Sequence, residues 1–263
     1  MERRVSCEVC NSSIGGTLVS VFPNIIMKVP ANASMQEKST IYESAVNSPR
    51  EMSLLEFLKL GEKYREVIER LRSCEDKEIR NKIKRTELPC ATISASFTSR
   101  ASSKAVEEKL KRYNSLMVLD FDNLEDPAAA KEELSQLPFF WYIGLSVGGK
   151  GLFGIVPLGT DDFKEHKVYF NALRKELEVF GYEVDKACCD VTRLRVVSYD
   201  PDAFFNENCE VFCIDEREED DGEVYSSGPV PERAQDRSSR IELYVLEWEM
   251  RRVPLDDYQD WMT

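Results

Sequence analysis

Residues 115–124 read Ser115-Leu116-Met117-Val118-Leu119-Asp120-Phe121-Asp122-Asn123-Leu124, an apolar run that ends in two acids. The apolar run predicts a buried β-strand. Side chains alternate along a strand, so Asp120 and Asp122 share a face, roughly 6.5–7 Å apart, while Phe121 turns into the core. Two carboxylates aimed at one place repel each other, which favours a divalent ion between them or a raised proton affinity in one acid. The alternative is that the strand simply ends here and the acids are solvated turn residues.

The totals describe an ordinary soluble globular protein. The chain has 263 residues, of which 42% are hydrophobic and 32% charged, enough for one substantial domain with or without a smaller appendage. No apolar stretch approaches the roughly 18–20 residues that span a bilayer, and the first residues lack a signal-peptide core. We therefore expect a cytoplasmic protein with no membrane partner.

The formal net charge of −13 argues against binding of nucleic acid over the whole surface, because neutralisation of phosphates by basic residues supplies most of the non-specific affinity for nucleic acid. Part of the excess lies in the acidic run 215–223, which is typical of a solvated linker. A basic groove elsewhere is still allowed, and residues 77–85 and 100–112 are the candidates.

Eight cysteines show none of the framework of a small secreted domain. Cys7 and Cys10 form a CxxC, which is half a zinc site or a redox pair, but no second pair follows with ligand spacing. We expect free thiols in a reducing compartment.

Helical and strand patterns alternate along the rest of the chain. Ser53 and Glu56 resemble a capping box that opens a helical pair. Further helices are predicted at 107–113, 127–137, 163–180 and 239–252, and strands at 91–98, 139–146, 192–199 and 209–214. His166, the only histidine, is expected on the surface of its helix. The order predicts an α+β fold with a mostly antiparallel sheet.

A glycine-rich turn joins two of these strands. Residues 146–151 contain Ser146, Gly148, Gly149, Lys150 and Gly151. Backbone amides of such a turn can approach a phosphate closely, and Lys150 adds a positive charge. The glycine-lysine spacing differs from that of a Walker loop, and a strand follows in place of a helix. The alternative is a flexible hairpin tip without a ligand.

A third acidic position follows. Asp185 comes after an apolar residue at a strand-like edge, and Asp190 competes with it; we favour Asp185. Arg193 and Arg195 lie on the next predicted strand, where a regular pleat would place both on the same face and Leu194 in the core.

In this order the three pieces resemble the motifs of archaeo-eukaryotic-type primases: an acid pair after apolar residues, a glycine-rich hairpin, and a third acid followed by a strand with arginine. Residues 88–97, 146–151 and 193–202 resemble more closely the N-terminal domain of VirE-type (virulence-associated E) proteins, which are common in Bacteroides and in mobile elements. The resemblance spans roughly residues 50–215.

The resemblance implies a primase-polymerase core with an RRM-like sheet, preceded by an α/β N-terminal unit. Asp120, Asp122 and Asp185, with Asp190 as the competing ligand, would hold two Mg²⁺ or Mn²⁺ ions. Ser146, the hairpin glycines, Lys150, Arg193 and Arg195 would bind the nucleoside triphosphate. The expected function is a metal-dependent nucleotidyltransferase of the primase class that copies a single-stranded template during replication of a mobile element.

The resemblance also divides the chain. Residues 1–215 would be the primase-polymerase-like domain, 216–238 an acidic linker, and 239–263 the start of a truncated C-terminal primase or helicase-linked module, or of a link to a helicase partner.

One departure favours a different function. The histidine of the family's hairpin motif falls at Phe153, which neither donates a hydrogen bond nor carries charge. A catalytically inactive nucleotide-binding or nucleic-acid-binding domain that supports a helicase is the second hypothesis. A protein-interaction module, in which the acids and arginines only form ion pairs, is the third.

Overall fold

The computed structural model describes residues 11–22, 49–99, 104–214 and 237–250. The CxxC of Cys7 and Cys10, the acidic run 215–223 and most of the predicted linker lie outside the described residues.

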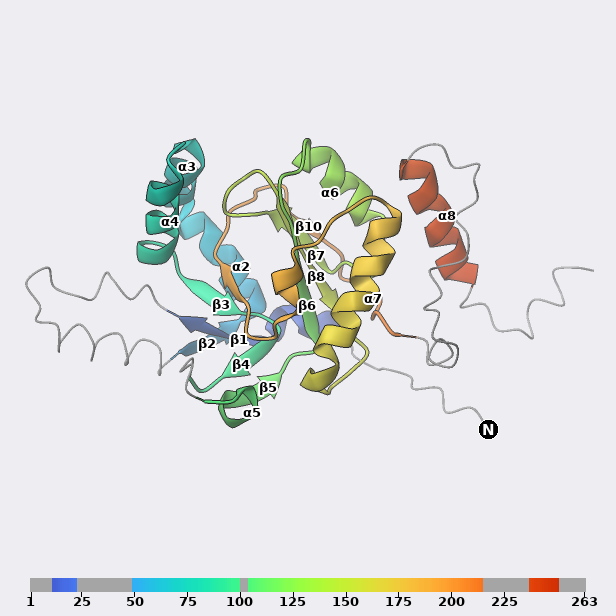
Figure 1. Ribbon diagram of the computed structural model, residues 1–263, viewed down its shortest axis with the longest axis horizontal. Coiled ribbons are helices and arrows are strands. Elements are labelled where there is room, and N and C mark those ends of the chain that lie inside the picture. The colour runs from blue at the N-terminus through green and yellow to red at the C-terminus, as the bar shows by residue number, and fades with distance from the viewer. Residues whose placement is uncertain (1–10, 23–48, 100–103, 215–236, 251–263) are drawn as a thin grey trace, which may run out of the picture.

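Two four-stranded antiparallel sheets form the body of the molecule (Figure 1). The first has the order β2 (Arg50–Ser53), β1 (Leu18–Phe22), β3 (Cys90–Thr92), β9 (Leu194–Val196). The second has the order β10 (Phe204–Phe205), β7 (Tyr142–Leu145), β8 (Leu152–Pro157), β6 (Leu116–Phe121). A smaller pair joins β4 (Ala95–Phe97) to β5 (Leu110–Tyr113). The α+β class and the antiparallel pairing are confirmed.

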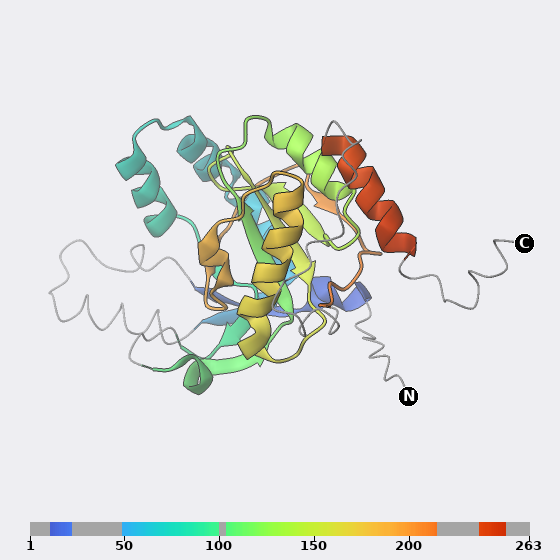
Figure 2. The same cartoon turned by 45° about the vertical axis from the view of Figure 1, so that its right-hand side comes forward.

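The described α-helices are α2 (Leu54–Lys63), α3 (Arg65–Ser73), α4 (Lys77–Thr86), α5 (Val106–Lys109), α6 (Pro127–Ser135), α7 (His166–Val179) and α8 (Arg237–Met250). Short 3-10 helices are η1 (Asn11–Gly16), η3 (Phe163–Glu165) and η4 (Lys186–Cys189). Helix α7 crosses one face of the second sheet, while α3 and α4 lie at one end of the molecule and α8 at the other (Figures 1 and 2).

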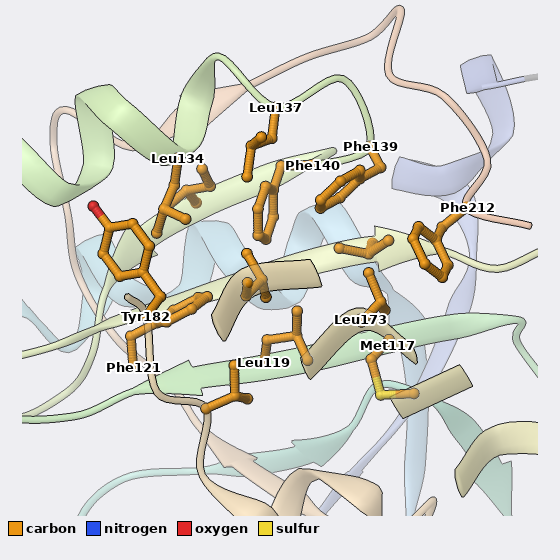
Figure 3. Close-up of a cluster of buried hydrophobic side chains, with 14 of the residues drawn as sticks. Met117, Leu119, Phe121, Leu134, Leu137, Phe139, Phe140, Leu173, Tyr182 and Phe212 are labelled. Atoms are coloured by element: carbon orange, nitrogen blue, oxygen red, sulfur yellow. The ribbon is translucent and has the colours of Figure 1, made fainter. Parts of the chain in front are cut away.

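Strand β6 is buried on both faces, as its unbroken apolar run predicts. Met117, Leu119 and Phe121 point to the helices, where they pack with side chains of α6 and α7 (Figure 3). Leu116 and Val118 point the other way, into a second cluster shared with the first sheet and α2. By the same alternation Asp120 lies on the face toward the first sheet.

Local sequence signals account for several helix ends. The Ser53 hydroxyl accepts from the Glu56 amide at 3.3 Å, and a Glu56 carboxylate oxygen accepts from the Ser53 amide at 2.8 Å. This is the predicted capping box, and it satisfies amides that the first turn of α2 leaves without partners.

Four predicted elements need correction. The segment 107–113 is helical only in α5 and continues as β5, whose residues pair with β4. The predicted strand 91–98 is split into β3 and β4, which belong to different sheets. Residues 209–214 contribute an isolated bridge between Leu158 and Phe212 in place of a strand. Asp185 follows a coil segment and caps η4, which begins at Lys186.

The expected surface position of His166 is wrong. Its side chain is 2% exposed, and Nδ1 lies 2.9 Å from the Tyr113 hydroxyl of β5. The imidazole is enclosed by Tyr113 of β5, whose ring lies edge-on to it, and by η4, which packs on α7 and whose Cys188 backbone hydrogen-bonds to His166.

Helix α8 packs on the helix-side cluster. Ile241 and Tyr244 are buried there, and the Trp248 ring stacks on Phe212 with centroids 6.4 Å apart. None of the described helices is long and apolar enough to cross a membrane.

Candidate active site

Asp120 lies between the two four-stranded sheets, near the end of β6. Only 9% of its side chain is exposed, and its Oδ1 accepts a hydrogen bond from Nη2 of Arg195 on β9. The Arg195 guanidinium also lies 4.8 Å from the ring centroid of Phe153, which is the residue opposite Asp120 on β8. A buried carboxylate thus has a buried cation as its neighbour, which compensates both charges.

A backbone hydrogen bond holds Asp185 beside Asp120. Its amide donates to the Asp120 carbonyl at 2.9 Å, and its carboxylate accepts from the Ala187 amide at 3.0 Å, which starts η4. The turn returns Cys188 to the site, where its thiol donates to Asp120 Oδ2 at 3.6 Å. Oxygen or sulfur atoms of Asp120, Asp185 and Cys188 all lie within 4.8 Å of one another.

Asp122 lies next to this group, in the loop that follows β6. Much of its side chain is exposed; burial of the remainder is the larger cause that raises its pKa, and the negative charges of Asp120 and Asp185 raise it further. The second cause is the repulsion that paired acids predict. The structure therefore brings Asp185 to Asp120, and it places Asp122 near enough for both charges to act on it, outside the group whose ligand atoms lie within 4.8 Å of one another.

Asp190 lies elsewhere and has a local role. It is exposed, and its carboxylate accepts from the Thr192 amide and hydroxyl, each at 2.8 Å. An aspartate that caps its own turn in this way is common in loops. Of the two competing acids, the structure places Asp185 beside Asp120.

Both predicted arginines reach the acids. Arg193 Nη2 lies 2.6 Å from Asp185 Oδ2 and 3.7 Å from Asp120 Oδ2. It is partly exposed, at 39% of its side chain, whereas Arg195 is buried at 10%. Leu194 between them is half-buried.

The glycine hairpin lies against the backbone of the acidic loop. A Cβ on Gly151 would stand 2.2 Å from the Phe121 carbonyl oxygen, so only glycine permits this approach. The Leu124 amide donates to the Lys150 carbonyl at 3.1 Å. Gly149 has φ of +73°, and the Lys150 side chain is exposed at the hairpin tip.

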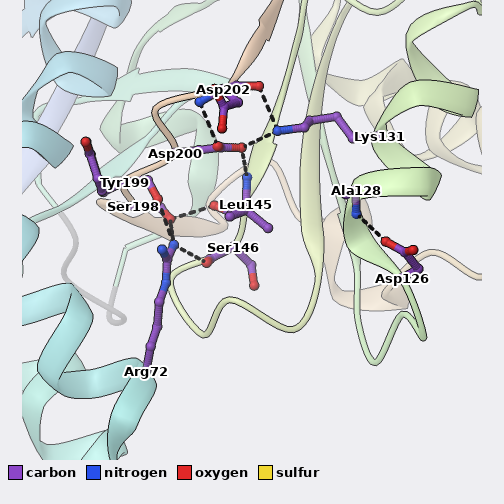
Figure 4. A network of polar contacts seen from close by, with 10 residues as sticks. All are labelled: Arg72, Asp126, Ala128, Lys131, Leu145, Ser146, Ser198, Tyr199, Asp200 and Asp202. Atoms are coloured by element: carbon purple, nitrogen blue, oxygen red, sulfur yellow. Dashed lines mark hydrogen bonds and ion pairs between the residues drawn. The ribbon is translucent and has the colours of Figure 1, made fainter.

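Two polar networks fix the hairpin from outside (Figure 4). Arg72 of α3 donates to the carbonyl oxygens of Ser146 at 3.1 Å and Tyr199 at 2.7 Å. Asp200 accepts from the Leu145 amide at 2.9 Å and pairs with Lys131 at 2.9 Å. The hairpin that carries Lys150 is therefore held to α3 and to the segment after β9.

Sequence reasoning did not identify Cys188 or Arg72. Cys188 is three residues after Asp185, a spacing that brings side chains together in a helical turn. The turn η4 is too short to show a helical pattern in the sequence. Burial and the neighbouring Asp120 charge raise the pKa of its thiol to about 12, so it is a protonated donor at neutral pH.

A groove of about 1020 Å³ lies away from the acids, along α2 and the start of β7. Its lining includes Trp141, Tyr142, Tyr199 and Phe205 but none of the three aspartates. The groove and the acidic site are connected through packed rings, since Tyr142 lies 5.0 Å from Phe153, centroid to centroid. Volume alone would have pointed to the groove, whereas the convergent charges point to the acids.

The acidic group fits a divalent ion in its donor chemistry. Two carboxylates within 4.8 Å of each other, with Asp122 nearby, offer the oxygen ligands that Mg²⁺ and Mn²⁺ prefer. Arg193 and Arg195 now contact those oxygens, so an ion would compete with guanidinium groups for them.

Residues 83–205 match the model of a family described as the BT4734-like, N-terminal domain. This is a Bacteroides-type domain family, and the matched segment falls within residues 50–215, over which the sequence resemblance extends. The matched segment contains the three aspartates, the hairpin and both arginines. No curated protein and no solved structure matches the chain.

Proposed function

We propose that this protein is a metal-dependent nucleotidyltransferase of the primase-polymerase class, acting in replication of a mobile element. The observation that carries the proposal is the convergence of Asp120 and Asp185 from segments more than sixty residues apart, next to Asp122, whose pKa their charges raise. Carboxylates that repel one another at one point, next to cationic side chains, are what nucleotidyl transfer requires. The primase-like resemblance of these acids supports it, as does the VirE-like resemblance of residues 88–97, 146–151 and 193–202.

Each side chain has a defined role in this proposal. Asp120, Asp122 and Asp185 would hold Mg²⁺ or Mn²⁺, which when bound lowers the pKa of the attacking hydroxyl and stabilises the leaving pyrophosphate. Lys150 and the amides of the glycine hairpin bind phosphate oxygens, and the hairpin's contact with the acidic loop sets their separation. Arg193, which is partly exposed, moves from Asp185 to the triphosphate when a substrate binds.

Template-directed incorporation of nucleotides into a primer or a new strand tests the proposal. We would compare the wild type with Asp122→Asn, since Asp122 is exposed and its loss should leave the fold intact. We expect incorporation with Mg²⁺ or Mn²⁺ to fall by about 100-fold or more. The matched control is Glu125→Gln, another exposed acid of the same loop, which should keep full activity. Equal incorporation by wild type and Asp122→Asn would refute the proposal.

The second candidate function is nucleotide or single-strand binding without catalysis, in support of a helicase. It is favoured by the Arg195 guanidinium, which sits between Asp120 and the Phe153 ring. A buried arginine on this carboxylate would oppose an ion there. Salt-sensitive binding of oligonucleotides, with no incorporation under any metal, would support this function over the first.

A further inference from the structure

Helix α4 carries a concentration of positive charge that contrasts with the whole chain. Its residues 77–86 include five basic side chains and one acid, Glu78, so 5 − 1 gives a net charge of +4, against −13 for the protein. The basic residues are Lys77, Arg80, Lys82, Lys84 and Arg85. Positions three, four and seven residues apart share a helix face, so Lys77, Arg80 and Lys84 lie on one side and Lys82 and Arg85 on another.

Arg80 reaches the glycine hairpin. A Cβ on Gly148 would stand 3.0 Å from Arg80 Nη2, so the absence of a side chain at Gly148 makes room for the guanidinium. Nε of Arg80 is buried and has no hydrogen-bond partner among the described residues. No described carboxylate forms an ion pair with Arg80 either. A guanidinium partly removed from water without an acceptor is costly, and an anionic ligand would offset that cost.

Lys84 is one helical turn further along the same face and is half-buried. Burial and the charge of Arg80 lower its pKa, while Asp122 and Asp120 oppose that shift. The charge of Arg80, on the hairpin side, and the charges of Asp122 and Asp120, on the acidic side, therefore all act on the Lys84 ammonium group. Within the described part of the chain it forms no ion pair.

We propose that Arg80 and Lys84 of α4, together with the Gly148 to Gly151 turn and Lys150, form a binding site for a polyphosphate chain. The inference deepens the proposed function, because it places the triphosphate of the substrate between α4 and the hairpin. Arginine suits this role because its planar fork binds phosphate oxygens in pairs. Lys84 lies at the acidic end, where it neutralises charge between the phosphates and Asp122.

The test is titration of sodium tripolyphosphate into the protein with a chelator present, followed by calorimetry. The double variant Arg80→Gln/Lys84→Gln should weaken binding by at least about tenfold, the loss expected for charge-assisted hydrogen bonds. The matched control, Lys82→Gln/Arg85→Gln, removes the same charge from the other side of α4, where both residues are exposed. It should change affinity by no more than about twofold, since exposed charges are well screened.

Gly148→Ala provides a second variant that alters no charge. Its methyl group would crowd Arg80 Nη2, so we expect weaker tripolyphosphate binding with an unchanged unfolding temperature. Equal losses in both double variants, or no binding by the wild type at millimolar tripolyphosphate, would overturn the inference. Because this binding is measured without metal or template, it can persist when nucleotide incorporation fails, which separates this inference from the proposed function.

Discussion

At the scale of single residues, the site depends on a carboxylate kept between two sheets. A buried aspartate without a partner would protonate or destabilise the fold, and Arg195 prevents this by pairing with Asp120. Both side chains are at most a tenth exposed. The more exposed Arg193–Asp185 pair is available for exchange with ligands. The two arginines therefore differ in what they contribute, although they are only two residues apart.

This difference predicts unequal effects on stability. Asp120→Asn leaves the buried Arg195 charge unpaired, and Arg195→Met leaves Asp120 with only the more distant Arg193, at 3.7 Å; each should cost about 3–5 kcal/mol. The double variant should cost less than the sum of the two, because neither charge is then left alone. Arg193→Gln, at 39% exposure, should cost at most about 1 kcal/mol. Urea unfolding of the four variants measures the free energy of unfolding of each. If the loss in the double variant equals the sum of the losses in Asp120→Asn and Arg195→Met, the two residues do not form a buried pair.

His166 predicts a pH dependence of stability. Burial lowers its pKa to about 4 from an unperturbed 6.5, so the folded state keeps the imidazole neutral. Below pH 6.5 the imidazole binds a proton in the unfolded chain but not in the folded protein. The free energy of unfolding therefore falls as pH decreases toward 4. This residue alone should contribute a slope that rises from about 0.7 kcal/mol per pH unit at pH 6.5 to about 1.2 kcal/mol per pH unit near pH 5.

The variant His166→Gln should lose that slope, and unfolding free energies at several pH values measure the difference. Acidic groups titrate mainly below this window and affect both proteins alike. Parallel pH profiles would show that the imidazole is accessible to protons in the folded state.

At the scale of elements, the site depends on two backbones that meet closely. The hairpin between β7 and β8 and the loop after β6 touch through Gly151. The sequence predicted strand β6 and the hairpin, because the apolar run of β6 and the glycines of the hairpin are local signals. The role given to the acids stays a prediction. Strands β3 and β4 were predicted as one strand, but β5 has only four residues, too few for a periodic pattern, and was predicted as helix. The contact of Tyr113 with His166 comes from β5, so it could not be foreseen.

Gly151→Ala tests this contact. The added methyl would meet the Phe121 carbonyl oxygen at 2.2 Å, and neither backbone can move freely. We expect a loss of about 1–3 kcal/mol, the usual cost of overpacking, with weaker metal-dependent nucleotide binding because Asp122 is displaced. Gly16→Ala is the control, since nothing lies within 4 Å of its added Cβ. Thermal unfolding compares the two, and equal melting temperatures would mean that the hairpin does not touch the acidic loop.

At the scale of the whole molecule, the second sheet is the middle layer. Helices α6, α7 and α8 cover one face, and the first sheet with α2 covers the other (Figure 2). The sequence predicted the class of fold but not this layering, which depends on pairings between distant segments such as β3 with β9. Asp120 is on β6 of the second sheet and Arg195 is on β9 of the first. The two side chains meet because these sheets pack against each other.

The layering also predicts that α8 unfolds with the rest of the molecule. Ile241 is fully buried in the helix-side cluster, so Ile241→Ala should cost about 2–5 kcal/mol through lost burial and the cavity left behind. Leu246→Ala, on a side chain that is 55% exposed, should change the free energy of unfolding by less than about 0.5 kcal/mol. Urea unfolding followed by tryptophan fluorescence and by circular dichroism should give one coincident transition for both variants. A separate early transition that Ile241→Ala alone displaces would mean that α8 is a unit of its own, docked on a core that is already stable without it.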